Sequence, residues 1–448
     1  MSSPARAVTG ADFDRDVPLL IVKIGGYPLS HQGLAAVRSL GRVGVPVYTI
    51  TEDRFTPQAL SRHLAGRFVF PTTGSEPPDE LVGALLEISA RLGRRAIVLP
   101  TDDEAAILLA EHASDLASAF ILPRIPPDLP RRVASKRGLH ELSVSLGVPT
   151  PKTMFVGSIA AIAAAADQLS FPIVVKNADA WLRLSSPVIR STTIMPTVAD
   201  LLDAASTWKD PPGVVLQEHI PTAHAQDWVF HGYFGDQPAS SVGFTGVKYR
   251  SWPSRAGVTS LGRAVYNPGL LEQSVNLCRR LGFRGIVDLD WRFDARDGAY
   301  KLLDFNPRTG ANFRMFETAD GIDVVRALHL DLTGRSVPSG RAVEGRGLIV
   351  EHLDVPSRIA QRWFRSAGGP PPAVAGRIEP AWFAGDDLLP FLAMLVRVVS
   401  PSAKRLARTA SGVVRGLRPR WKLRPRGAAP EGPSAQRALR PPAGDAPQ

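Results

Sequence analysis

Short apolar runs alternate with amphipathic stretches along the first hundred residues. Residues 19–24 form an apolar run of strand length that ends in two glycines, and residues 33–43 repeat apolar side chains at helical spacing. Further apolar runs follow at residues 45–50 and 96–100. A strand, a glycine turn, a helix and a second buried strand make a βαβ unit, so we expect parallel strands joined by a right-handed crossover.

The glycine turn does not by itself indicate a dinucleotide site. Gly25 and Gly26 are not part of a GxGxxG fingerprint, and the acids that follow the second strand are Glu52 and Asp53. A tight turn above the start of a helix explains the glycine pair better than an NAD site does. The N-terminal unit is therefore expected to resemble a nucleotide-binding domain in its chain order only.

Strands outnumber helices in the middle of the chain. A helix expected at residues 131–146 ends in Gly147 and is followed by two prolines, which separates the first unit from the next. The next unit extends to residue 335, and its strands are expected at 172–176, 213–220, 228–234, 285–294 and 300–306, with helices at 158–169 and 268–282. The predicted fold class is an α/β domain with a parallel sheet followed by an α+β domain.

Composition places the charge at one end of the chain. The 448 residues are 44% hydrophobic, enough for a large core, and the single cysteine, Cys278, excludes an internal disulfide. Of the net charge of +11, residues 401–448 contribute eleven Lys/Arg against Glu431 and Asp445. This Pro- and Arg-rich tail is too poor in large apolar residues to fold by itself, so we expect it to be disordered.

The tail suggests partners for the chain but does not identify them. Contact with an anionic membrane or with nucleic acid is a hypothesis that follows from its charge, and a homo-oligomer is an open alternative. Residues 1–16 have no signal-peptide pattern, and no apolar run reaches the roughly 18 residues that a membrane span needs. The expected location is cytoplasmic, with peripheral membrane contact as an additional hypothesis.

The stretch GIVDLDWRFDARDGAYKLLDFNPRTG, residues 285–310, contains the most specific chemical pattern. If two strands meet at a turn near residues 295–298, Asp288 and Asp290 share one face of the first strand, and Asp304 and Asn306 share one face of the second. Carboxylate and amide oxygens suit Mg²⁺ together with nucleotide phosphates. An ordinary hairpin with an acidic outer face is the alternative, although the other face of both strands is apolar.

This hairpin resembles the C-terminal subdomain of ATP-grasp enzymes, which have an acid on one strand and then acid-x-Asn-Pro-Arg. Within that superfamily, which includes biotin carboxylase and carbamoyl phosphate synthetase, the chain most resembles predicted bacterial carboxylate-amine ligases, over roughly residues 20–335. The resemblance implies a pre-ATP-grasp domain, a two-subdomain ATP-grasp fold, and ATP with two Mg²⁺ ions. It implies Asp290, Asp304 and Asn306 as metal ligands and Arg308 as the catalytic arginine that steadies the transferred phosphoryl group.

The same resemblance implies a nucleotide site upstream of the hairpin. The segment SKRGLHELS resembles the part of the family in which a lysine precedes a helix, and its matching residue is Lys136. Lys176, at the end of PIVVK, matches the second of the two lysines that offset the charge of the triphosphate. The strand VVLQEHI matches the hinge that meets adenine. The implied contacts with ATP are Lys136, Lys176, Gln217, Glu218, Ile220 and Asp227, of which Asp227 would meet the ribose. Solvated lysines and a plain edge strand are the alternatives.

Two further segments are expected to lie beside this site. The family usually has a glycine-rich flap after the second lysine, whereas residues 177–195 contain no glycine, so the backbone of residues 178–186 would have to form the lid. Residues 244–263 are expected to form a cationic, aromatic loop in which Lys248, Arg250 and Arg255 hold an acidic substrate. A solvated basic loop is the alternative.

The resemblance implies a ligase that activates a small-molecule carboxylate as an acyl phosphate, forms a C–N bond with an amine, and releases ADP and phosphate. A carboxylase that uses bicarbonate and an ATP-binding sensor without catalysis are the alternatives. The expected organisation is a flexible segment at 1–17, a pre-ATP-grasp domain at 18–125, an ATP-grasp domain at 126–335, an extension packed on the body at 336–400 and the disordered tail at 401–448.

Overall fold

A computed structural model describes residues 11–179, 181, 188–189, 192–253, 257–363 and 376–399. The chain divides into a body, Met1–Pro401, and a second unit, Ser402–Gln448. The second unit contains most of the basic tail, and the whole of 401–448 lies outside the described residues, as do residues 182–187 of the expected flap. The fold below is therefore that of the body.

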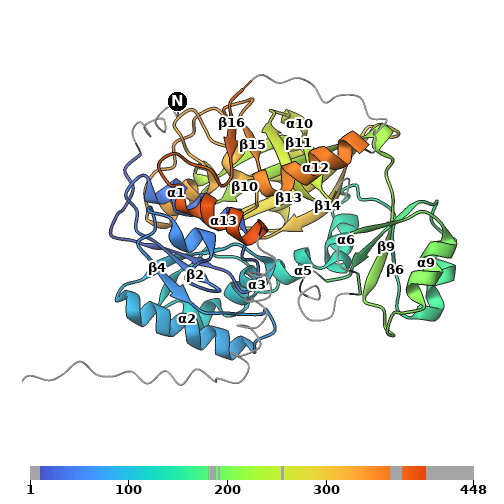
Figure 1. Ribbon diagram of the computed structural model, residues 1–448, viewed down its shortest axis with the longest axis horizontal. Helices are drawn as coiled ribbons and strands as arrows, with labels where there is room; N and C mark the ends of the chain where they lie inside the picture. The colour runs from blue at the N-terminus through green and yellow to red at the C-terminus, as the bar shows by residue number, and fades with distance from the viewer. Residues whose placement is uncertain are drawn as a thin grey trace, which may run out of the picture. The chain divides into compact units, whose positions relative to one another are not determined.

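The N-terminal domain has a five-stranded parallel sheet in the order β3-β2-β1-β4-β5 (Figure 1). Its strands are β1 Leu19–Val22, β2 Val47–Thr51, β3 Gly66–Val69, β4 Ala96–Pro100 and β5 Phe120–Ile121, and its helices are α1 His31–Gly41, α2 Pro78–Leu92, α3 Asp103–Glu111 and α4 Ala113–Leu116. The expected βαβ unit is confirmed, because β1 pairs in parallel with both β2 and β4. Both faces of the central strands are buried, as a parallel sheet requires.

The N-terminal domain begins before the first strand. Of the segment expected to be flexible, residues 11–17 are described, and Phe13 is 7% exposed and belongs to the main hydrophobic core. Arg335 forms an ion pair with Asp14 at 3.8 Å across the same junction. The described part of this segment is thus packed on the body.

Two helices occupy the place of the single helix expected at 131–146. These are α5 Leu129–Ala134 and α6 Lys136–Ser145. The break falls at Ser135, whose backbone is extended and whose hydroxyl accepts a hydrogen bond from the Gly138 amide as an N-cap. This break sets Lys136 at the first position of α6. In Figure 1, α5 and α6 lie between the N-terminal sheet and the next, smaller sheet.

The smaller sheet has four strands in the order β6-β9-β7-β8, all antiparallel. They are β6 Thr153–Phe155, β7 Ile173–Asn177, β8 Thr193–Met195 and β9 Val214–Glu218, and the helices α7 Ile162–Ala166 and α9 Val198–Ala205 accompany them. Helix α9 begins with a capping box in which Thr197 and Asp200 exchange hydrogen bonds. The sequence predicted β7 and β9, but not the short strands β6 and β8.

A seven-stranded sheet in the order β14-β13-β10-β11-β12-β15-β16 forms the rest of the body. Its strands are β10 Ala225–Phe234, β11 Val242–Trp252, β12 Val258–Ala264, β13 Gly285–Asp294, β14 Ala299–Asn306, β15 Gly347–Ile349 and β16 Ile378–Pro380, with helices α10 Pro268–Arg280, α11 Val324–Leu332 and α12 Glu351–Trp363. The loop expected at 244–263 is wrong, because those residues form most of β11 and β12. Pairing of β11 with β10 on one side and β12 on the other outweighs the local basic composition.

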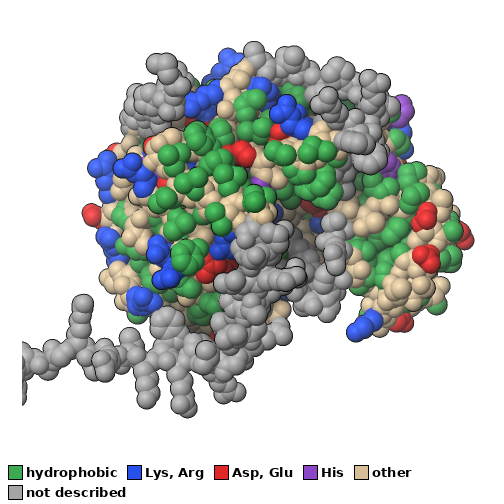
Figure 2. All heavy atoms as spheres, viewed as in Figure 1, with side chains coloured by type: hydrophobic (Ala, Val, Ile, Leu, Met, Phe, Trp, Pro, Cys, Tyr) green, Lys and Arg blue, Asp and Glu red, His purple; other side chains and the backbone are tan. Residues whose placement is uncertain are grey.

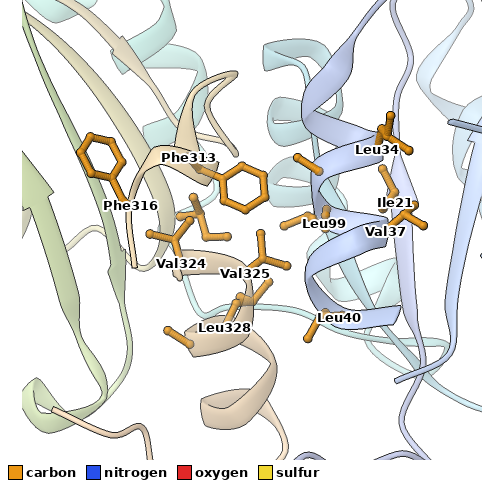
Figure 3. Packing of buried hydrophobic residues seen from close by; sticks show 14 of the residues in the cluster. Ile21, Leu34, Val37, Leu40, Leu99, Phe313, Phe316, Val324, Val325 and Leu328 are labelled. Atoms are coloured by element: carbon orange, nitrogen blue, oxygen red, sulfur yellow. The ribbon is translucent and has the colours of Figure 1, made fainter. Parts of the chain in front are cut away.

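One core joins the N-terminal domain to the large sheet. Figure 3 shows the two sides of this contact, with Phe313, Val325 and Leu328 facing the helix that carries Leu34 and Val37. All five side chains are at most 2% exposed. The close packing holds the carboxyl ends of β1 and β4 next to the exit of β14.

Helix α13, Leu389–Val399, packs on the N-terminal domain through Pro390 and Met394, and Arg397 forms an ion pair with Asp53 at 2.6 Å. Its other face is apolar and exposed, and Figure 2 shows hydrophobic side chains gathered on the face of the molecule that carries α12 and α13. No helix among the described residues is long and apolar enough to cross a lipid bilayer.

Candidate active site

Strands β13 and β14 bring the acidic side chains of the hairpin together. Asp290 lies directly opposite Asp304, and Asp288 lies directly opposite Asn306. Opposed residues in an antiparallel pair point to the same face, about 5 Å apart at their Cβ atoms. The turn at Gly298, whose φ is +70°, sets this register. The hairpin and the shared face thus follow the sequence-based expectation.

Three lysines from three other elements surround the two opposed aspartates. Lys136, at the start of α6, forms an ion pair with Asp304, and Lys176, at the end of β7, has its Nζ 3.8 Å from the second oxygen of the same carboxylate. Lys248 on β11 places its Nζ 2.6 Å from Oδ1 of Asp290. Each of the two carboxylates therefore has at least one lysine partner within the protein itself.

The charges in this cluster change one another's pKa values. Burial by itself raises the pKa of Asp304, but Lys136 and Lys176 lower it to about 2. Burial raises the pKa of Asp290, with Asp288 and Asp304 adding to the effect against Lys248. Burial also lowers the pKa of Lys176. Titratable groups with such opposed shifts in one cleft are typical of functional sites.

A cavity of about 790 Å³, including its open mouth, lies over these groups between the small sheet and the large sheet. Its lining includes eight of the residues that the sequence singled out, namely Lys176, Gln217, Glu218, Ile220, Asp227, Lys248, Asp290 and Asp304. Val174, Ile194 and Leu303 add an apolar wall. The cavity thus brings most of the nucleotide candidates together with two of the metal candidates, whereas Lys136, Asn306 and Arg308 are not part of its lining.

The expected adenine hinge already has protein partners in the structure. Glu218 accepts a hydrogen bond from Arg296 at 2.6 Å, and Gln217 donates from Nε2 to the Thr153 hydroxyl at 3.0 Å. The side chain of Ile220 is buried, and its backbone carbonyl accepts a long hydrogen bond of 3.4 Å from Nη1 of Arg292. These contacts fix the orientation of the strand end along the cavity.

Arg292 is a site residue that the sequence reasoning missed. Its guanidinium forms a two-pronged ion pair with Asp227, at 2.7 Å and 3.0 Å, and it lines the cavity. The pair joins β13 to β10, which lie side by side. The signal that could have found it is its position on β13, two residues after Asp290. Asp227, the expected ribose contact, is therefore held in place by this arginine.

Arg308 lies where the exit of β14 meets the N-terminal domain. Its Nε is 3.2 Å from Oδ1 of Asp103, at the start of α3, and its Nη1 is 3.2 Å from Oδ2 of Asp288. His231 on β10 places Nε2 2.9 Å from the other Asp288 oxygen. Asp103 and His231 were not expected from the sequence, because each comes from a distant strand or helix start.

Asp288 acts as an anchor for its neighbours. Asn306 donates from Nδ2 to the Asp288 carbonyl at 3.1 Å, so the amide oxygen of Asn306 is its remaining ligand atom. Although burial raises the pKa of Asp288, the adjacent His231, Arg308 and Lys248 hold that pKa well below its usual value. Asp288 stays ionised and positions Asn306 and Arg308.

The three expected substrate cations have different surroundings. Lys248 faces the cavity, whereas Arg250 forms an ion pair at 2.7 Å with Asp354, a 2% exposed residue on α12. An irregularity in the pairing of β11 with β12 at these positions separates the two side chains. Arg255 lies outside the described residues. Of the two that are described, Lys248 lines the cavity and Arg250 does not.

The donor set around Asp290 and Asp304 is oxygen only. Within the part of the chain that the structure describes, no three His, Cys, Asp or Glu side chains are grouped closely enough to hold a metal by themselves. Mg²⁺ is usually bound through one or two carboxylates together with substrate phosphates and water. Two aspartates and the Asn306 amide fit that pattern, and they do not fit a metal site made of protein ligands alone.

Comparison with known proteins gives one curated relative and many solved structures. No family model matches the chain. A D-aspartate ligase of Enterococcus faecium is 23% identical over 246 residues, which is 52% of this chain and 58% of that ligase. The chain therefore spans somewhat over half the length of the curated relative that it matches.

The solved structures share the fold at low sequence identity. The N5-carboxyaminoimidazole synthetase of Staphylococcus aureus, bound to ADP, has a TM-score of 0.55 at 12% identity and covers 75% of this chain and 82% of its own. An L-amino acid ligase of Bacillus licheniformis has a TM-score of 0.53 at 15% identity, with 71% and 75% covered. The biotin carboxylase domain of Hydrogenobacter thermophilus 2-oxoglutarate carboxylase, bound to MgADP and bicarbonate, has a TM-score of 0.53 at 13% identity, with 72% and 71% covered. The parallel N-terminal sheet, the two further sheets and these likenesses together show that the chain has the fold of the ATP-grasp superfamily.

Proposed function

We propose that this protein is an ATP-dependent ligase that joins a carboxylate to an amine through an acyl phosphate. The observation that supports it best is the single cavity in which Lys176, Lys248, Asp290 and Asp304 meet the strand end Gln217–Glu218. The residues for holding a nucleotide and for neutralising a transferred phosphoryl group come from five separate strands. A purely structural salt-bridge cluster does not require an apolar wall and a strand end beside it.

The nucleotide fits the cavity with its base at the strand end and its phosphates at the lysines. The apolar wall of Val174, Ile194 and Leu303 suits the faces of adenine, and Glu218 suits its exocyclic amine. Asp227, steadied by Arg292, suits the ribose hydroxyls. Lys136 and Lys176 then exchange part of their contact with Asp304 for phosphate oxygens.

Asp290, Asp304 and Asn306 would hold Mg²⁺, and two ions are proposed. The ions supply Lewis-acid polarisation of the phosphate oxygens and a fixed geometry for the chain of phosphates. Lys136 and Lys176 lower the pKa of Asp304 to about 2 against the effect of its burial, so this carboxylate is ionised at neutral pH. For Asp290, burial raises the pKa, and Lys248 opposes that shift. Asp304 has a shorter side chain than the glutamate that often stands at this position in the family, which is a departure from the family pattern in addition to the glycine-free flap.

In the proposed reaction, an oxygen of the substrate carboxylate forms a bond to the γ-phosphorus of ATP, the bond from that phosphorus to the β-phosphate oxygen breaks, and ADP leaves. An amine then attacks the acyl carbon, phosphate leaves, and the amine loses a proton to solvent or base. Arg308 is placed to offset the charge on the transferred group. Asp103 and Asp288 orient Arg308 from two sides.

The names of two relatives support the ligase proposal. One is a D-aspartate ligase and another an L-amino acid ligase. The other two are an N5-carboxyaminoimidazole synthetase with ADP and a biotin carboxylase domain with MgADP and bicarbonate. The proposal follows the first two because they form bonds between carboxylates and amines. Amino acids and peptides are the first substrates to test.

The test measures ADP release with MgATP and pools of carboxylates and amines. We expect stimulation by a carboxylate–amine pair, and loss of that stimulation in Asp304→Ala and Asn306→Ala. Asp297→Asn, on the turn of the same hairpin, is the control and should behave as wild type. Stimulation by bicarbonate without another carboxylate would favour a carboxylase, whereas ATP binding with no stimulation by any pool would favour a sensor.

A protein that does not bind ATP at all would reject the proposal. Binding should therefore be measured first, by the change in thermal unfolding with MgATP. A ligand that binds only the folded state raises stability by about 2.7 kcal/mol at a hundred times its dissociation constant. Lys176→Met should reduce this stabilisation, because Lys176 lines the cavity beside Asp304.

A further inference from the structure

A second cavity has Arg308 in its wall. It measures about 530 Å³ together with the open space at its mouth, and it is bounded by the end of β4, helix α3, the loop before α5, the start of β13 and helix α11. Apolar side chains make up most of its wall, among them Val98, Leu109, Leu122, Ile286 and Leu328. Among the described residues that line it, Arg284 and Arg308 are the charged ones.

The geometry of β13 places the two cavities in line. Ile286, Asp288 and Asp290 alternate along this strand, which pairs with β10 without interruption, so all three side chains lie on one face. Successive members are about 7 Å apart, since a strand rises roughly 3.4 Å per residue. Asp290 lines the nucleotide cavity, Asp288 holds Arg308, and Ile286 lines the second cavity. The order along the face is therefore phosphoryl site, arginine, apolar cavity.

The two arginines have different roles in this cavity. Arg284 donates to the Phe283 carbonyl at 3.0 Å and lies 3.7 Å from Asp236, and about a third of its side chain is exposed. Arg308 is half as exposed and adjoins Asn306 through the Asn-Pro-Arg turn. A guanidinium has a planar fork of five donors, which suits a carboxylate. The carboxylate end of a ligand is thus expected at Arg308.

We propose that this cavity binds the apolar side chain of the carboxylate substrate, with the carboxylate at Arg308 facing the phosphoryl site. The inference rests on the proposed ligase function and adds the substrate class, a carboxylic acid or amino acid with an unbranched or branched hydrocarbon side chain. Apart from Arg308, the cation in the described lining is Arg284, which already lies 3.7 Å from Asp236, so the cavity offers no unopposed charge to an acidic side chain such as that of aspartate. The apolar lining instead favours each methylene that enters it.

The experiment traps the acyl phosphate with hydroxylamine, so that no amine substrate has to be known. The acids are the unbranched series from acetate to hexanoate and the 2-amino acids from glycine to norleucine, compared with aspartate and glutamate. Each buried methylene should improve the apparent affinity about fourfold until the cavity is full. Aspartate and glutamate should give little hydroxamate.

Two variants with matched controls locate the effect. Ala110→Phe fills the cavity from α3 and should remove the preference for longer acids, while Ser114→Phe, at an exposed site on α4, should not. Leu122→Ala opens the wall and should weaken binding of the longest acid about fourfold or more. Leu86→Ala, at a partly exposed site on α2, is its control. Stabilisation by MgATP should be unchanged in all four variants, which shows that each is folded.

The outcomes separate this inference from the proposed function. Hydroxamate formed from aspartate or glutamate in preference to apolar acids, or without dependence on chain length, would overturn the inference and leave the ligase intact. If no acid gives hydroxamate or ADP, the ligase proposal fails, and binding of hexanoate and norleucine measured by thermal unfolding decides the cavity. Binding lost in Ala110→Phe then supports the apolar site, and no binding by wild type overturns it.

Discussion

Replacing Asp304 by asparagine tests the charge balance of the candidate active site. The substitution keeps the size of the side chain and removes the negative charge that lies between Lys136 and Lys176. The two lysines lower the pKa of Asp304 from 3.8 to about 2. A difference of nearly two pKa units corresponds to about 2.4 kcal/mol of net stabilisation of the charged carboxylate in the folded protein. Asp304→Asn should therefore be less stable than wild type by about this amount at pH 7.

The difference in unfolding free energy between wild type and Asp304→Asn should depend on pH. Because the pKa of Asp304 is lower in the folded protein than in the unfolded chain, the stabilisation is fully present above about pH 4 and declines as the pH falls toward 2. The difference between wild type and variant should be about half as large near pH 3 as at pH 7. Urea unfolding followed by circular dichroism at both pH values measures it.

The control for Asp304→Asn is Asp297→Asn on the turn of the same hairpin. Asp297 forms an ion pair with Lys301 at 3.0 Å but is half exposed, so its removal should cost less than about 1 kcal/mol. A variant at position 304 that matched wild type in stability at pH 7 would refute the idea that the two lysines are balanced by Asp304. It would also weaken the proposal that they are held ready for phosphate.

Three further predictions use other parts of the molecule. Lys248→Met should lower the rate of ADP release about a hundredfold, because Lys248 is the cation beside Asp290 in the cavity. Arg250→Met should instead lower the free energy of unfolding by about 3 kcal/mol, because it leaves the buried Asp354 on α12 without its ion pair. Steady-state kinetics and urea unfolding distinguish the two effects. Burial, with a smaller contribution from a neighbouring histidine, lowers the pKa of His31 from 6.5 to about 4. The unfolding free energy of wild type should therefore fall by about 3 kcal/mol between pH 6.5 and pH 4. In the same assay, the unfolding free energy of His31→Gln should fall by less over that interval. Deleting residues 401–448 should abolish sedimentation with anionic liposomes or with RNA, and unchanged sedimentation of both would reject the contact hypothesis.

Local patterns determined the parts of the fold in which neighbours in sequence are also neighbours in space. The hairpin of β13 and β14 is one such part, because strand alternation and one turn set the opposition of Asp290 and Asp304. The βαβ order of the N-terminal domain is another, because buried strands and a glycine turn suffice to predict it. In contrast, β11 and β12 were mistaken for a loop, since their pairing with distant strands is not encoded in the local composition.

For the candidate site, the sequence by itself determined which chemistry the hairpin can support, and a family resemblance suggested where the lysines and the hinge would lie. Only the tertiary structure decided the partners: Lys248 meets Asp290 while Arg250 turns to Asp354, and Asp288 becomes an anchor for Arg308. The apolar cavity beyond Arg308 also has no sequence signature. Its walls come from five elements that are far apart in the chain, and only their packing brings the apolar surfaces to face one another.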